Sequence, residues 1–342
     1  MVVTRAIFGL SGPELNDRER QFFKRTNPWG IILFRRNIQN RKQLTELCCS
    51  LRSLTGRDDL PILIDQEGGR VQRMGPPEWR AFPSAAMLGK IYEKDPVRGR
   101  ELIRLNARLI AYDLKEVGIS VNCAPMLDIR TDKANEDVIG DRSFSMESDA
   151  VSVMGRAYAE GLLAGGILPV IKHMPGHGRA EVDSHEKLPI VTASLEDLQN
   201  TDFKPFMALK DMPVAMPAHI VYSSFDKEYP ATVSSVMIRE IIRNSMGYRG
   251  LLITDDLSMK ALQGSFDERA ANAYKAGCDI ALHCNGNMDE MEELAEALLP
   301  LDGKPALRAS IALERIAHTV EPLDIVRVTD FMKKELSELA MV

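Results

Sequence analysis

The feature that most constrains the fold is a series of eight short apolar runs separated by amphipathic stretches. The runs are rich in Ile, Val and Leu and cover 5–10, 30–34, 61–65, 119–125, 167–173, 212–219, 250–256 and 278–285. Helical spacing between them predicts helices over 40–54, 97–117, 149–164, 195–210, 234–245 and 267–276. Continuously apolar strands that alternate with helices indicate a parallel sheet covered on both faces. Eight such units predict an α/β fold, a closed (β/α)8 TIM barrel.

Chain length agrees with one barrel, since α/β barrels commonly occupy about 250 residues or more as a single domain. We therefore predict one catalytic barrel domain over 1–342, with C-terminal helices at about 288–342. A doubly wound open sheet is the competing architecture, but it usually carries an early glycine-rich phosphate loop. GLSGPEL after the first strand matches such a loop poorly. Residues 66–96, a long insertion after the third strand, are expected to form part of the pocket wall.

Charge and hydropathy exclude several kinds of partner. The chain has 43 basic and 49 acidic residues, a net charge of -6, and no block of five like charges, so nucleic acid and anionic membranes are not expected partners. No apolar run approaches the ~20 residues of a membrane span, and no secretory signal is visible. The five cysteines are odd in number and match no zinc motif, which favours reduced, packed thiols. We expect a cytoplasmic protein.

Polar residues gather at the ends of the predicted strands. In a barrel the carboxyl ends of the strands converge on one face, where barrel enzymes have their active sites. At or just past these ends lie Asp65, Asp128, Lys172, His173, His219, Asp255 and Asn285. The pattern predicts a catalytic site on that face.

Two strand-end motifs supply carboxylates. In IDQEGGRVQR (64–73), Arg73 follows Asp65 by eight residues and can curl back over the same pocket. In TDDLSMKAL (254–262), Asp256 is expected to cap a following helix, while Asp255, still on the strand, points into the barrel mouth. A strand-end carboxylate without a nearby cation in the sequence is costly unless it is paired or used, which favours a functional role for Asp255.

The segment Leu168–Pro189, LPVIKHMPGHGRAEVDSHEKLP, begins as a strand and continues without periodicity, as functional loops do. Asp183 and His185 are two residues apart, so in an extended segment they point the same way. Asp183 can then bond one ring nitrogen and leave the other for proton transfer. His173 and His177 could join this pair in a metal site. However, H-x-H and H-E-x-x-H motifs are missing and the glycines indicate a mobile segment, so we predict acid/base work with no metal and no cofactor.

Together, IDQEGGRVQR, KHMPGHG with the following DSH, and TDDLSM resemble the family 3 glycoside hydrolases, specifically their single-domain β-N-acetylglucosaminidases. The resemblance runs in order from about Gly9 to about Asn285. One departure is Met174, where the family more often has Phe.

The resemblance implies a role for each matching residue. Asp255 is similar to the family's nucleophile, His185 to its general acid/base and Asp183 to the orienting partner of that histidine. The positions that grip the hydroxyls of N-acetylglucosamine are matched by Asp65, Arg73, Arg142, Lys172 and His173. The implied substrate is a small glycan or muropeptide.

The implied activity is that of a retaining exo-β-N-acetylglucosaminidase acting through a covalent glycosyl-enzyme. Its substrates would be N-acetylglucosaminyl-1,6-anhydro-N-acetylmuramyl peptides, and its role would be cytoplasmic cell-wall recycling. Three alternatives stay open: a metal-dependent barrel hydrolase, a non-catalytic sugar-binding barrel and an N-acetylglucosaminide phosphorylase. The sequence does not predict the oligomeric state.

Overall fold

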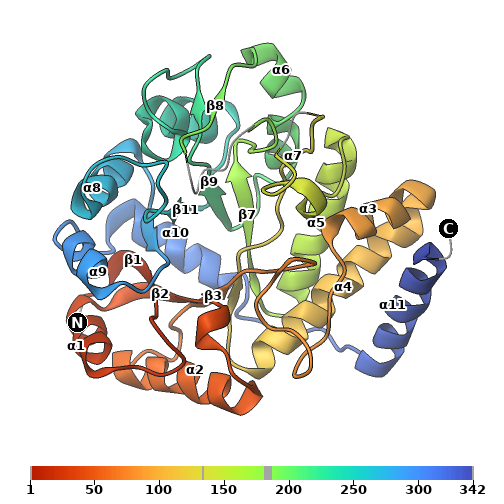
Figure 1. The fold of residues 1–342 in the computed structure, drawn as a ribbon, viewed down its shortest axis with the longest axis horizontal. Helices are drawn as coiled ribbons and strands as arrows, with labels where there is room; N and C mark the ends of the chain where they lie inside the picture. Colours follow the sequence, from red (N-terminus) through yellow and green to blue (C-terminus); the bar gives the residue numbers. More distant parts are fainter. Residues whose placement is uncertain (1, 133–134, 181–186, 341–342) are drawn as a thin grey trace.

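In the computed structural model, which describes residues 2–132, 135–180 and 187–340, eight parallel strands form a closed barrel surrounded by helices (Figure 1). The strands follow one another around the ring in chain order, and the last pairs with the first. They are β1 (Thr4–Gly9), β2 (Pro28–Leu33), β3 (Ile62–Ile64), β6 (Val121–Asn122), β7 (Leu168–Met174), β9 (Val214–Pro217), β11 (Leu251–Asp256) and β12 (Ile280–His283). Each of the eight predicted runs supplies one strand, so the predicted TIM barrel is confirmed.

Helices pack around the outside of the barrel. They are α1 (Asp17–Thr26), α2 (Arg41–Thr55), α4 (Pro96–Glu116), α5 (Ser148–Ala164), α6 (Leu195–Asn200), α7 (Phe203–Ala208), the π-helix η4 (Val236–Ser245) and α8 (Phe266–Ala276). The single helix predicted over 195–210 is wrong, because the chain forms the two short helices α6 and α7. Pro205 explains the break: it has no N–H to donate, and it is tolerated only in the first turn of α7.

The insertion after β3 forms part of the cavity wall, as predicted, through Glu67, Val71 and Arg73. It contains the hairpin β4 (Gln66–Gly68) and β5 (Val71–Gln72), followed by α3 (Ala85–Lys94). The buried Gln66 side chain closes the hairpin: Nε2 donates to the carbonyl of Met74 at 2.7 Å and Oε1 accepts from the N–H of Arg73 at 2.9 Å. The remaining short elements are β8 (Ile190–Val191) paired with β10 (Val221–Tyr222), and the 3-10 turns η1 (Arg35–Asn37), η2 (Gly140–Arg142) and η3 (Ala231–Val233).

Three helices follow the last strand, as predicted for the C-terminal region. They are α9 (Met288–Ala295), α10 (Gly303–Glu314) and α11 (Ile325–Ala340). Helix α9 packs beside α8 and α1, and α11 lies outside α4 (Figure 1). Helix α10 places Ala309 and Ala312 against the apolar interior of the barrel, at the end where the strands begin. Over the described ranges, no helix combines the length and apolarity needed to cross a membrane.

Alternation along the strands decides which side chains face the barrel axis. On β7, Leu168 and Val170 belong to the interior cluster, as do Leu251 and Ile253 on β11. Successive strand side chains point to opposite faces, so the next interior positions toward the carboxyl ends are Lys172 and Asp255. The barrel interior is therefore apolar along its length and becomes charged only at its carboxyl-terminal mouth.

At the amino-terminal end of the barrel, Asp279 anchors helix α10 to the barrel. This carboxylate is 1% exposed and receives Arg243 at 2.8 Å, Arg308 of α10 at 2.7 Å and the backbone N–H of Leu252 at 2.9 Å. This single carboxylate therefore pairs with two guanidinium groups at once. Its removal leaves both cations without their shared counter-charge.

We therefore expect Asp279→Ala to lower the free energy of unfolding by about 3–5 kcal/mol, the usual cost of removing one partner from a buried ion pair. Urea denaturation followed by circular dichroism measures this. Asp289→Ala is the control: its carboxylate pairs with Arg18 at 3.0 Å but is 85% exposed, and its loss should cost less than about 1 kcal/mol. Equal effects of the two substitutions would contradict the anchoring role of Asp279.

Candidate active site

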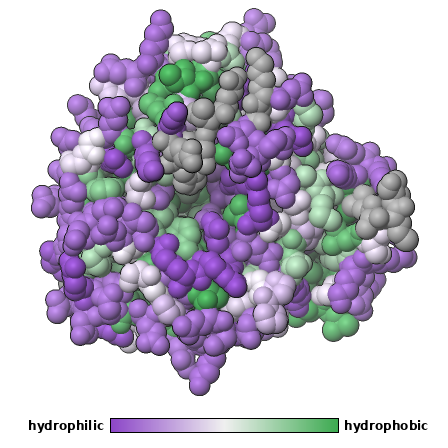
Figure 2. All heavy atoms as spheres, in the orientation of Figure 1, coloured by the Kyte–Doolittle hydropathy of each residue, from purple (hydrophilic) through white to green (hydrophobic). Residues whose placement is uncertain are grey.

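A cavity of about 220 Å³ opens at the carboxyl-terminal mouth of the barrel. The face shown in Figure 2 is largely hydrophilic and is hollowed near its centre. Six of the predicted site residues line this one cavity: Asp65, Arg73, Arg142, Lys172, His173 and Asp255. They come from four different strands or connections, so the barrel gathers residues that are up to 190 positions apart in the sequence.

Asp65 pairs with two cations in the cavity, Lys172 and Arg73. Its Oδ1 accepts from Lys172 Nζ at 2.9 Å and its Oδ2 from Arg73 Nη2 at 3.2 Å, so Arg73 curls back as predicted. Burial alone would raise the pKa of Asp65, but the ammonium of Lys172 and the guanidinium of Arg73 lower it. Asp65 is therefore a carboxylate at neutral pH, able to accept hydrogen bonds from sugar hydroxyls.

Glu67 is a pocket residue that the sequence analysis missed. Its carboxylate receives Arg142 through Nε at 3.0 Å and Nη2 at 2.8 Å, and Lys172 Nζ lies 2.7 Å away. Burial opposes ionisation, yet Arg142 and then Lys172 hold the pKa of Glu67 far below its usual range. Its place two residues after Asp65, in the same motif, was the available sequence clue. Glu67 fixes the directions of two cations that line the cavity.

His173 is held by Asp128. The ring atom Nδ1 lies 2.7 Å from Asp128 Oδ2, and the ring lines the cavity. Burial would raise the pKa of Asp128, but His173 beside it lowers that pKa. The pair therefore consists of a buried carboxylate and an imidazole whose other edge faces the cavity.

Asp255 and Asp256, the last two residues of β11, line one side of the cavity. Asp255 ends the interior series of β11 and its Oδ1 accepts the N–H of Asp256 at 2.8 Å. The prediction that Asp256 caps a helix is wrong. Its carboxylate instead accepts Ser258 N at 3.0 Å, Ser258 Oγ at 2.6 Å and Cys284 N at 3.0 Å. The sequence suggested a cap because Asp commonly precedes helices, but here the chain makes a turn first, and α8 begins only at Phe266.

The remaining strand-end residues support the structure. His219 is fully buried, with Nδ1 2.8 Å from Thr232 Oγ1 and Nε2 3.0 Å from the carbonyl of Asp256, so it braces the connection after β11. Asn285 does not line the cavity; its Nδ2 donates to Glu290 Oε2 at 2.6 Å. Asn285 follows the carboxyl end of β12, as predicted, but its side chain is bound to α9 instead of the cavity.

Asp183 and His185 lie outside the described residues. The part of the connection that precedes them, 175–180, is largely buried. Gly178 lies so close to the backbone that an added Cβ would sit 1.7 Å from the carbonyl oxygen of Ile129. Tyr222 Oη also donates to the carbonyl of Gly176 at 2.6 Å. These glycines thus permit close packing.

Within the described ranges, which leave out 181–186, no three His, Cys, Asp or Glu side chains are grouped so that they could hold a metal ion. All five cysteines are unpaired thiols.

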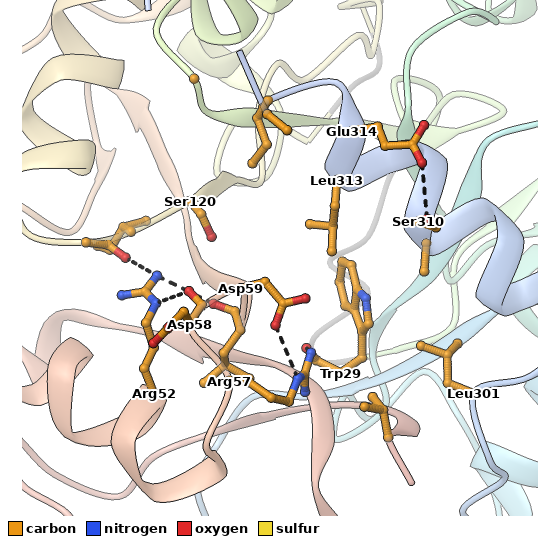
Figure 3. Close-up of a pocket in the computed structure, with 18 of the residues that line it drawn as sticks. Trp29, Arg52, Arg57, Asp58, Asp59, Ser120, Leu301, Ser310, Leu313 and Glu314 are labelled. Carbon is orange, nitrogen blue, oxygen red and sulfur yellow. Dashed lines mark hydrogen bonds and ion pairs between the residues drawn. The ribbon is translucent and has the colours of Figure 1, made fainter. Parts of the chain in front are cut away.

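A larger cavity, about 680 Å³, lies at the amino-terminal end of the barrel (Figure 3). Its arginines already serve the fold: Arg57 Nη1 donates to the carbonyl of Pro28 at 2.8 Å and Arg52 Nη2 to that of Gly118 at 2.7 Å. In the smaller cavity, by contrast, the charged groups converge on open space. The smaller, carboxyl-terminal cavity is therefore the candidate active site.

Known proteins with similar sequences and structures were then compared with the chain. The profile of the glycosyl hydrolase family 3 N terminal domain matches residues 3–318. A beta-hexosaminidase of Bordetella avium is 36% identical over 84% of this chain and 82% of that protein, and one of Alkalilimnicola ehrlichii is 34% identical over 96% and 97%. The crystal structure of NagZ from Neisseria gonorrhoeae in complex with N-trifluoroacetyl-D-glucosamine covers 98% of this chain and 99% of its own, with a TM-score of 0.88 and 32% identity.

His177, which also lines this cavity, makes the stability of the fold depend on pH. Burial lowers the pKa of His177 to about 4, and the neighbouring His173 lowers it further while Asp128 opposes the shift. Between pH 6.5 and 4 the unfolded chain therefore binds a proton at this residue that the folded chain does not. Stability contributed by the neutral ring is present at pH 7 and is lost as the pH falls through this window.

We expect the free energy of unfolding of the wild type to fall between pH 7.5 and pH 5 by about 1–2 kcal/mol more than that of His177→Gln. Urea denaturation at the two pH values measures the difference. The buried rings of His219 and His283 titrate in both proteins and cancel in the comparison. Parallel pH profiles for the two proteins would show that His177 is not the titrating group.

Proposed function

The chain belongs to glycosyl hydrolase family 3, and from this membership we propose that it is a retaining exo-β-N-acetylglucosaminidase. As a family member it is a glycoside hydrolase. The observation that best supports the narrower activity is the single cavity that holds Asp255 together with Asp65, Arg73, Arg142, Lys172 and His173. Its volume of about 220 Å³ is below the range usual for drug-sized ligands, which favours one terminal sugar over an internal stretch of polymer.

Asp255 is proposed as the nucleophile. Retaining hydrolysis needs a carboxylate below the anomeric carbon and a proton donor near the leaving oxygen. Asp255 lies at the interior end of β11, in the cavity with the cations and carboxylates that would grip the sugar hydroxyls. It would stabilise the oxocarbenium-like charge and then bond to the anomeric carbon, forming the glycosyl-enzyme.

His185 is proposed as the acid/base and Asp183 as its orienting partner, from their match to the family motif. An imidazole with an ordinary pKa near 6.5 can donate a proton to the leaving oxygen and later accept one from water. The Asp183 carboxylate would select the tautomer and favour the imidazolium. Neither step requires a metal or an organic cofactor.

The biological role is part of the same proposal. We infer one barrel domain that acts on N-acetylglucosaminyl-1,6-anhydro-N-acetylmuramyl peptides during cell-wall recycling in the cytoplasm. Similarity to the gonococcal NagZ extends over 98% of the chain, which supports a single barrel unit. Five unpaired thiols, one of them exposed, agree with a reducing compartment.

Asp255→Ala should lower kcat for N-acetylglucosamine release at least about 10³-fold, because the covalent step loses its nucleophile. Release from a chromogenic N-acetylglucosaminide measures it, and an unchanged thermal unfolding midpoint shows that the protein is folded. Added azide should restore turnover and yield the α-glycosyl azide, since it attacks from the side that Asp255 occupied. Asp330→Ala, on the exposed surface of α11, is the control. Near-normal turnover by Asp255→Ala would exclude it as the nucleophile.

His185→Ala should reduce turnover of alkyl or glycan substrates by roughly 10²–10⁴-fold, the usual contribution of general acid catalysis. Aryl glycosides whose leaving groups need no proton should lose much less in their first step, which a pre-steady-state burst reports. Glu181→Gln is the matched control, because Glu181 is the nearest alternative acid. Equal losses for both substrate types, or a larger loss in Glu181→Gln, would count against His185.

A further inference from the structure

We propose that Asp128 is a positioning residue for the reaction: it determines which nitrogen of His173 carries the proton, and it holds the start of the connection that follows β7. This inference rests on the proposed function. Asp128 itself is fully buried and does not line the cavity, so it acts through the residues it binds.

Both carboxylate oxygens of Asp128 are occupied by groups from the end of β7 and from the connection that follows it. Oδ2 lies 2.7 Å from His173 Nδ1, and Oδ1 accepts the backbone N–H of His177 at 2.6 Å. The N–H of His173 lies between them, 3.2 Å from Oδ1 and 3.3 Å from Oδ2. One side chain thus receives three donors from a five-residue stretch.

A carboxylate can only accept hydrogen bonds, so Nδ1 of His173 must carry the proton. In the neutral ring, Nε2 is then an acceptor with its lone pair available on the cavity side. No hydrogen-bond partner within the described residues reaches Nε2. While the ring is neutral, Asp128 therefore presents an acceptor to a hydroxyl of the bound sugar.

The same carboxylate fixes the start of the connection. Its bond to the N–H of His177 is one of several contacts there: Gly178 packs on the carbonyl of Ile129, and Thr131 Oγ1 donates to the carbonyl of Gly178 at 3.0 Å. Asp128, Ile129 and Thr131 belong to one strand-end segment. Residues 128–131 therefore serve as the platform on which 176–180 lie.

Asp128→Asn tests the tautomer directly. Two backbone N–H groups lie near Oδ1, so the asparagine oxygen should take that position and the amide nitrogen should face His173 Nδ1. An amide N–H donates, so Nδ1 would become the acceptor and the proton would move to Nε2. The cavity would then offer a donor where the wild type offers an acceptor.

The first measurement is ¹⁵N NMR of the protein labelled at its six histidines, with His173→Gln identifying the His173 signals. We expect a proton on Nδ1 in the wild type and on Nε2 in Asp128→Asn. A neutral wild-type ring protonated at Nε2 would overturn the proposal. This measurement on the wild type remains decisive if the variant folds poorly.

The second measurement is steady-state kinetics with a chromogenic N-acetylglucosaminide. Asp128→Asn should raise KM about tenfold or more, because a sugar hydroxyl faces a donor in place of an acceptor. A purely structural role would reduce the active fraction, which lowers apparent kcat and leaves KM unchanged. Unchanged KM together with unchanged ring signals would reject the positioning role.

Asp113→Asn is the matched control. Asp113 is also a buried carboxylate, but it lies on α4 and pairs with Arg80, outside the cavity. Its substitution should leave both KM and the His173 signals unchanged. If the wild type released no N-acetylglucosamine, the proposed function would fail, whereas the NMR result would still decide whether Asp128 sets the tautomer.

Discussion

Buried charge in the barrel mouth is the constraint on which the site depends. Removing a carboxylate or an ammonium group from water is costly unless partners compensate it. Asp65 and Glu67 share Lys172, while Arg73 and Arg142 satisfy their outer oxygens. The carboxylates of Asp255 and Asp256 line the same cavity, so three cations face four carboxylates there. A neutral sugar can therefore bind among paired charges without introducing an unbalanced one.

The fold and most of the cavity were predictable because both follow from short-range periodicity. Continuous apolar runs identify the strands. Side chains alternate along each strand, so Lys172 faces the barrel interior like Leu168 and Val170. Asp255 does so in the same way after Leu251 and Ile253. Once the barrel is predicted to close, the carboxyl ends of its strands are expected to meet on one face. The resemblance supplied Arg142, which no periodicity would have selected.

The roles of the other site residues could not be predicted, because they depend on contacts between segments that are far apart in the sequence. Glu67 gains its role only when the β4–β5 hairpin brings it to Arg142, 75 residues away, and Asp128 gains its role only from a histidine 45 residues later. Asp256 satisfied the local rule for a helix cap, yet its carboxylate binds the N–H of Cys284 on the next connection. Local preferences cannot reveal such contacts. Helix α1 was missed because only Phe22 and Phe23 in it are apolar.

Acid sensitivity follows from the way the site is anchored. Asp128 needs the backbone N–H of His177, and this bond draws the imidazole into a buried position next to His173. A buried ring beside another histidine resists protonation, so the pKa of His177 falls and the folded state loses stability in acid. A serine or alanine at 177 could donate the same backbone N–H without that penalty. The stability lost at low pH therefore comes from the side chain of His177, whereas the anchoring contact comes from its backbone.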